Sequence, residues 1–108
     1  MRIEIDNPAR TDMLALLEEH LRNMHELSPP ESVLALDVSG LKSTDMTFWS
    51  VREGDLLLGC GALRQLTLEH GEIKSMRTPA ALRRHGAGRA ILNHILEVAR
   101  VRGYKRLS

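Results

Sequence analysis

The stretch Arg83-Arg84-His85-Gly86-Ala87-Gly88-Arg89 places two glycines among four cationic or potentially cationic side chains, just before a segment with apolar residues at helical spacing. Glycines carry no Cβ, so the backbone can approach a ligand closely. The first turn of a helix leaves N–H groups unpaired, and the helix dipole adds positive potential at the same point. The stretch therefore predicts an anion-binding turn at the start of a helix.

The segment after this turn has the pattern of an amphipathic helix that ends at about Arg102, because Gly103 stops it. Its apolar stripe consists of Ile91, Leu92, Ile95, Leu96, Val98 and Ala99. We expect Tyr104–Ser108 to form a strand after the helix.

Before the glycine turn, residues 46–77 alternate with a period of two. This pattern predicts strands over Met46–Arg52, Asp55–Leu66 and Glu72–Arg77, joined by turns at 53–54 and 69–71. Three consecutive strands with tight turns form an antiparallel meander. Gly59 and Gly61 within the second of these strands predict a bulge or bend.

The N-terminal part of the chain predicts a strand over residues 2–5 and a helix that begins at Thr11 or Asp12. Ser28-Pro29-Pro30-Glu31 ends this helix and can start a short second one over about residues 31–36. Asp37 to Asp45 is expected to be a loop. The predicted order is therefore β-α-α-β-β-β-α-β, an α/β (α+β) fold in a single domain, residues 1–108.

Composition excludes several classes of protein. The chain has 108 residues, 43% of them hydrophobic, and no apolar run approaches the ~20 residues that span a bilayer. Its first residues alternate like a strand and lack the apolar core of a signal peptide, so we expect a cytoplasmic protein with no membrane partner. The single cysteine, Cys60, has no companion for a disulfide or a zinc site, and we expect a buried thiol and no metal.

Charge is divided unevenly along the chain. Residues 1–73 hold six Lys or Arg against thirteen Asp or Glu, whereas residues 74–108 hold nine against one. A cationic third of this kind indicates a polyanionic partner, either a nucleotide cofactor or a nucleic acid, unless it is a solvated basic face. Only Phe48, Trp49 and Tyr104 are aromatic, which leaves few stacking platforms for bases and argues against nucleic acid. The dinucleotide and ATP fingerprints also fail, because Ile91 replaces the third glycine and no Gly-Lys-Ser/Thr follows.

The residues Arg83-Arg84-His85-Gly86-Ala87-Gly88 fit the pattern (Gln/Arg)-x-x-Gly-x-(Gly/Ala), and in this the chain resembles the GNAT superfamily of N-acetyltransferases. The stretch 72–78 looks like the strand that precedes this loop in the family. Residues 28–32 and 47–63 resemble a bacterial branch whose substrate is unassigned. The resemblance implies a mixed, mainly antiparallel sheet, here without the helix and two strands that usually follow the strand at Tyr104.

The resemblance also implies the function: transfer of an acetyl group from acetyl-CoA to a primary amine of a small or amino-acid-like acceptor, by direct attack. The amides of the loop would hold the pyrophosphate, and the preceding strand would hold the pantetheine arm. The cofactor-binding residues implied are Met76, Arg77, Thr78, Arg83, Arg84, His85, Gly86, Ala87, Gly88, Arg89 and Asn93.

Catalytic and acceptor residues follow from the same resemblance. Glu72 stands where some members place a glutamate base, and strand alternation predicts that it shares a face with Lys74 and Met76. The alternative for Glu72 is an ion pair with Lys74. His25, in the link between the first two predicted helices, is the candidate for acceptor binding. The family's usual acid, a tyrosine, lies beyond the part that matches, and Tyr104 is expected to be a half-buried aromatic instead.

Three further expectations remain. An open last strand or uncovered sheet face would favour a homodimer. The chain could be a truncated, inactive fragment that still binds CoA. A nucleic-acid-binding module that uses the basic last third is the remaining alternative.

Overall fold

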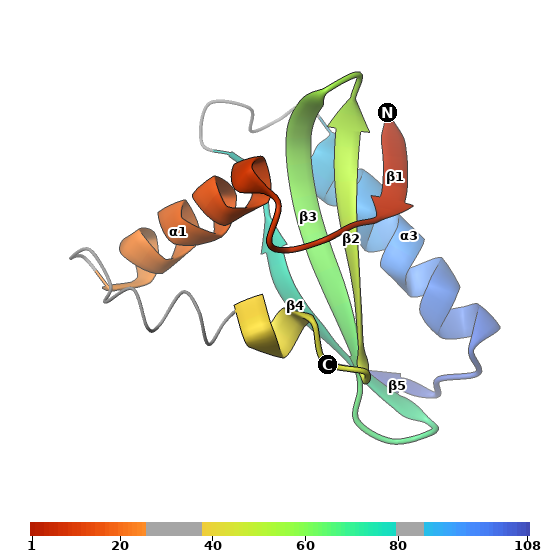
Figure 1. The fold of residues 1–108 in the computed structure, drawn as a ribbon. Coiled ribbons are helices and arrows are strands. Elements are labelled where there is room, and N and C mark those ends of the chain that lie inside the picture. Colours follow the sequence, from red (N-terminus) through yellow and green to blue (C-terminus); the bar gives the residue numbers. More distant parts are fainter. Residues whose placement is uncertain (26–37, 80–85) are drawn as a thin grey trace.

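The five strands form one sheet in the order in which they occur along the chain (Figure 1). This computed structural model describes residues 1–25, 38–79 and 86–108, without the side chains of residues 20 and 23–25. The strands are β1 (Arg2–Ile5), β2 (Met46–Glu53), β3 (Leu56–Gln65), β4 (His70–Arg77) and β5 (Arg106–Leu107). Neighbours are antiparallel except β4 and β5, which are parallel. The expected class, a mixed and mainly antiparallel α/β sheet with a meander, is confirmed.

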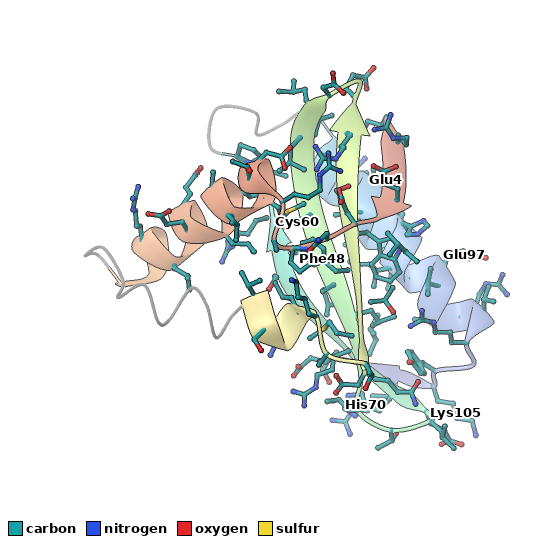
Figure 2. All side chains as sticks on the ribbon, viewed as in Figure 1. Glu4, Phe48, Cys60, His70, Glu97 and Lys105 are labelled. Atoms are coloured by element: carbon teal, nitrogen blue, oxygen red, sulfur yellow. The ribbon has the colours of Figure 1, made fainter. Side chains whose placement is uncertain are left out.

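Two helices cover opposite faces of this sheet (Figure 1): α1 (Thr11–His25) and α3 (Ala87–Val101). On the α1 face, Met13, Leu16 and Leu17 pack against β2 and β3, and Figure 2 shows Phe48 and Cys60 there. On the α3 face, Ile91 and Ile95 belong to the cluster that contains Trp49 and Leu63 of the sheet. Within the described ranges, neither helix is long and apolar enough to cross a membrane.

Element bounds differ from the expected ones at three places. The chain reverses earlier than expected before β4, because the Leu66 N–H already donates to the His70 carbonyl at 2.9 Å. β5 comprises two residues instead of five. The expected loop over 37–45 contains a helical turn at residues 38–41, stabilised by burial of Leu41 in the α1-face core. The helix expected over 31–36 lies outside the described residues.

β4 contains one extra residue opposite Gly61. Cys60 pairs with Arg77 but Ala62 pairs with Lys74, so Ser75 and Met76 together face a single residue of β3. Ser75 has a φ of 53°, in the left-handed region, and this is the local conformation that accommodates the bulge. The Cys60 thiol donates to the Ser75 carbonyl at 3.2 Å.

The bulge reverses the facing of the end of β4. Met76 packs against the α3-face core, whereas Lys74 lies on the α1 face, opposite Ala62. The prediction that Glu72, Lys74 and Met76 share one face is therefore wrong for Met76, because strict alternation holds only as far as the extra residue.

The two glycines of β3 allow close packing beside this bulge. A Cβ on Gly59 would lie 2.9 Å from the Arg77 carbonyl oxygen, and one on Gly61 would lie 3.0 Å from Ile91 Cγ1. The irregularity expected at these glycines takes two forms: a register shift beside Gly59, where β3 pairs with β2, and the bulge of β4 opposite Gly61. Both glycines therefore bring the end of β4 and α3 close to β3.

A buried ion-pair cluster links β1, α1 and β2. Arg52 is 2% exposed, and its guanidinium donates to Asp6 Oδ2 at 3.0 Å and to Asp12 Oδ2 at 2.6 Å. The Ser50 hydroxyl donates to Asp6 Oδ2 at 2.5 Å. These bonds satisfy a charge that would be costly to bury alone, and they fix the start of α1 against the sheet.

Candidate functional site

The N-terminus of α3 presents an open first turn. Gly86 is the residue before the helix, with a φ of 81°, and its carbonyl accepts from the Ala90 N–H at 3.0 Å. The amides of residues 87–89 precede that first helical bond and so have no acceptor within the helix. The first turn contains no acidic residue. Amide dipoles and the helix dipole therefore favour an anion at this point.

A hollow of about 370 Å³ lies between this turn and the end of β4. Its lining consists of Met76, Arg77, Thr78, Gly88 and Ile91, and we call it the α3 hollow. A Cβ added to Gly88 would meet no atom of the described residues within 4 Å. The glycine thus leaves the backbone accessible at the helix N-terminus, which is what close approach of a phosphate requires.

Four residues predicted to bind the cofactor line this hollow: Met76, Arg77, Thr78 and Gly88. Gly86, Ala87 and Arg89 form the adjoining helix start, where Ala87 is buried and Arg89 is exposed. Asn93 is exposed and is not part of the lining, so its role stays a prediction. Arg83, Arg84 and His85 lie outside the described residues.

Ile91 is a lining residue that the sequence analysis missed. It was assigned to the apolar stripe of the helix, and it does belong to the α3-face core. Its position one turn after Ala87, the first residue of the helix, is the signal that could have identified it, because this side of the helix faces the end of β4.

The edge of β4 is paired along only part of its length. β5 pairs at His70 and Gly71, and the Ile73 N–H donates to the Ser108 carbonyl at 2.9 Å. From Lys74 to Arg77, no strand of the described chain pairs with β4 on this side. Beside the α3 hollow, the bulged end of β4 thus lies outside the part of this edge that β5 pairs.

A second hollow, of about 230 Å³, lies on the opposite face of the sheet. We call it the α1-face hollow, and the described residues that line it are Gly40, Leu41, Ser43, Met46, Arg64, Lys74 and Ser75. The two hollows meet at the bulge, because Ser75 lines one and the next residue, Met76, lines the other.

Glu72 lies beside this second hollow. Its side chain is 34% exposed, and its Oε1 is 3.8 Å from Lys74 Nζ. Glu72 pairs with Arg64 across the strands, which places it two residues before Lys74 on the same face. The expected ion pair is thus present, and the role of Glu72 as a base stays a prediction.

Three other expectations concern single residues. His25 is the last residue of α1, but its side chain is outside the described part of the structure. Tyr104 is half-buried against Gly71 and donates to Gln65 Oε1 at 2.9 Å, as expected for a packing residue. Cys60 is a buried thiol, which confirms that expectation.

Comparison with known proteins identifies the family. Residues 11–108 match the family described as Acetyltransferase (GNAT) family. The chain is 50% identical over 108 residues to the uncharacterized N-acetyltransferase YsnE of Bacillus subtilis, and 47% identical over 106 residues to the uncharacterized N-acetyltransferase YedL of Escherichia coli. These matches cover 100% and 98% of this chain. The chain therefore belongs to the GNAT family of acetyltransferases.

Solved structures share the fold. The crystal structure of Rv2747 from Mycobacterium tuberculosis in complex with CoA and NLQ aligns with a TM-score of 0.63 and 27% identity over 99% of this chain. An aminoglycoside 6'-N-acetyltransferase complexed with coenzyme A aligns with a TM-score of 0.75 and 17% identity over 96% of this chain. The chain spans 72% of YsnE and 67% of YedL, and 62% and 58% of these two solved chains.

Proposed function

We propose that this chain binds acetyl-CoA and transfers its acetyl group to a primary amine of a small or amino-acid-like acceptor. The observation that carries the proposal is the α3 hollow, which joins the open first turn of α3 to the bulged end of β4 in a chain of the GNAT family. The names of YsnE and YedL, and the CoA in the two solved relatives, support the same activity.

The residues around the α3 hollow fit the parts of an acyl-CoA molecule. In the proposed complex, the amides of residues 87–89 bind the pyrophosphate, while Arg89 and the preceding Arg83, Arg84 and His85 add positive charge. The pantetheine arm runs along Met76, Arg77 and Thr78, and Asn93 lies at the rim. This path brings the thioester to the bulge, where the two hollows meet.

Acetyl transfer also requires that protons move. We assign the first proton transfer, from the acceptor ammonium, to Glu72. Its carboxylate removes a proton from the acceptor ammonium, and the neutral amine nitrogen then attacks the thioester carbonyl carbon. As the new C–N bond forms, the nitrogen releases its second proton to solvent; the C–S bond breaks, and the CoA thiolate leaves and takes up a proton. In the family that this chain resembles, the tyrosine that usually donates this proton follows the strand expected here from Tyr104 onward. Tyr104 is therefore not assigned this role.

Ligand-dependent thermal stability tests the proposal. We expect acetyl-CoA to raise the melting temperature, and duplex DNA and NAD to leave it unchanged. A shift with DNA alone would favour the nucleic-acid alternative, and no shift with acetyl-CoA would contradict the proposal.

Turnover with a panel of amines separates an enzyme from an inactive CoA-binding fragment, because the fragment would show the thermal shift without turnover. Glu72→Gln is expected to lower kcat by about 10²-fold or more while acetyl-CoA binding is retained. Glu97→Gln is the matched control, because Glu97 is an exposed glutamate of α3 that pairs with Arg100. Equal kcat in the two variants would remove Glu72 from the mechanism.

We also infer that the protein acts in the cytoplasm and as a homodimer, through the last strand or a sheet face. Sedimentation at micromolar concentration tests whether the protein is a homodimer, and a clean monomer would contradict this inference.

A further inference from the structure

We propose that the α1-face hollow binds the acceptor, and that the acceptor carries a carboxylate which Lys74 and Arg64 recognise. This inference rests on the proposed function, because it assigns the second substrate of the same reaction. It narrows the acceptor from any small amine to an amine that also bears an acidic group.

The lining of the hollow carries charge of one sign. Among the described residues that line it, Lys74 and Arg64 are the charged ones, and none is Asp or Glu. The register pairs Lys74 with Ala62, so Arg64 lies at the diagonal position on the same face, within reach of a long side chain. Two cations converging on one hollow favour an anionic ligand group.

Both cations keep donors for a ligand. The ammonium of Lys74 is 3.8 Å from Glu72, which is longer than a hydrogen bond, so this contact consumes none of its three N–H donors. Arg64 uses its Nε–H to bond Asp45 Oδ2 at 2.9 Å, and the guanidinium carries four further N–H donors on its terminal nitrogens. Asp45 therefore orients the Arg64 guanidinium and leaves the N–H donors of its terminal nitrogens for a ligand.

The position of the hollow suits the acceptor of an acetyl group. Ser75 belongs to its lining and Met76 to the lining of the α3 hollow, so the bulge lies between a ligand on the α1 face and the proposed thioester path. Glu72 is adjacent through its contact with Lys74. An amine held by its carboxylate at Lys74 would thus have the proposed base beside it on the α1 face, and the thioester would lie across the bulge from it.

The size and the apolar part of the hollow limit the acceptor further. A volume of about 230 Å³ is smaller than the ~300–1,000 Å³ typical of pockets for drug-sized ligands. Leu41 is buried and Met46 half-buried in the lining, which provides an apolar surface beside the two cations. The class that fits is a small amino acid or an amine of similar size with a carboxylate.

Matched probes test the role of the carboxylate without requiring turnover. N-acetyl-L-alanine and N-acetyl-L-alaninamide have nearly the same shape but differ in charge, and NMR titration into the full chain with CoA present measures the affinity of each. We expect the acid to bind about tenfold more tightly than the amide, as a charge-assisted pair would give. Lys74→Gln should remove most of this difference.

Lys105→Gln is the control, because Lys105 also contacts a glutamate, Glu69, at 3.4 Å but lies at the turn before β5, away from the hollow (Figure 2). It should leave the preference for the acid unchanged. Equal affinities for acid and amide, absence of binding by the acid, or the same loss in both lysine variants would overturn the inference. A separate titration with CoA alone keeps the two proposals apart, because failure to bind CoA contradicts the proposed function, whereas CoA binding without acid preference contradicts only this inference.

Discussion

Replacement of Asp6 by Asn is expected to lower the free energy of unfolding by about 2–3 kcal/mol near neutral pH. Burial alone would raise the pKa of the Asp6 carboxyl, but hydrogen bonds from Ser50, Asn7, Arg52 and Arg10 outweigh it and lower that pKa from 3.8 to about 2. At about 1.4 kcal/mol per pH unit, the difference between these values corresponds to about 2.5 kcal/mol. The Asp6 side chain is 6% exposed, so solvent screens this contribution little.

The effect should depend on pH in one direction. Because the pKa of Asp6 is lower in the folded state than in the unfolded chain, its contribution is present above the unfolded value of 3.8 and is lost as the pH falls from there toward 2. The difference between wild type and Asp6→Asn should therefore be largest near neutral pH and should shrink in acid.

Urea unfolding at a series of pH values measures this difference. Glu97→Gln is the control for general acid effects, because it removes an exposed carboxylate from an ion pair with Arg100, and it should change stability little. If Asp6→Asn destabilises the protein no more than this control, or if its effect is the same in acid as at neutral pH, the hydrogen bonds to Asp6 do not contribute the stability expected of them.

Three further predictions concern the hollow and the core around it. Gly88→Leu should abolish acetyl-CoA binding in calorimetry while the protein stays folded, because the new side chain projects into the α3 hollow; retained affinity would contradict its assignment. Gly61→Val should lower the free energy of unfolding by about 1–3 kcal/mol, because even a Cβ there lies 3.0 Å from Ile91 and 3.1 Å from Ile95; urea melts test this, and an unchanged midpoint would show that α3 can shift. Cys60 should react with a thiol reagent only on unfolding, since it is 0% exposed, and rapid labelling of the native protein would contradict its burial.

Much of the fold follows from local pattern. The alternation of residues 46–77 predicted β2, β3 and β4, and the stripe of Ile91 and Ile95 predicted α3, because apolar residues of each element pack into the cores on the faces of the sheet. Met76, Arg77, Thr78 and Gly88 were also predicted together, since the strand and the helix start on either side of the glycine turn meet in space.

The bulge could not be placed from the sequence. Ser75 is an ordinary strand residue by composition, and the left-handed φ that it adopts is more common for Gly or Asn. The alternation of strand side chains therefore predicted that Met76 shares the face of Lys74. The one extra residue in β4 places Met76 on the opposite face. The glycine that accompanies the bulge, Gly61, is on the neighbouring strand, which is why the irregularity was expected in β3.

The cluster around Arg52 was also missed, for a different reason. Asp6, Asp12 and Arg52 come from a loop, a helix and a strand, and their separations of 40 and 46 positions in the chain correspond to no local spacing. Only the packing of α1 against the sheet brings them together. A charged residue in a strand that is otherwise buried was the available signal, because such a residue requires partners.

The bulge of β4 has a consequence for how this domain can diversify. The described residues that line the two hollows differ throughout, and the two linings are joined by the backbone between Ser75 and Met76. Substitutions at Lys74 or Arg64 can change the α1-face hollow without altering the side chains that line the α3 hollow. A new specificity on the α1 face can therefore arise while the described side chains that line the α3 hollow stay the same.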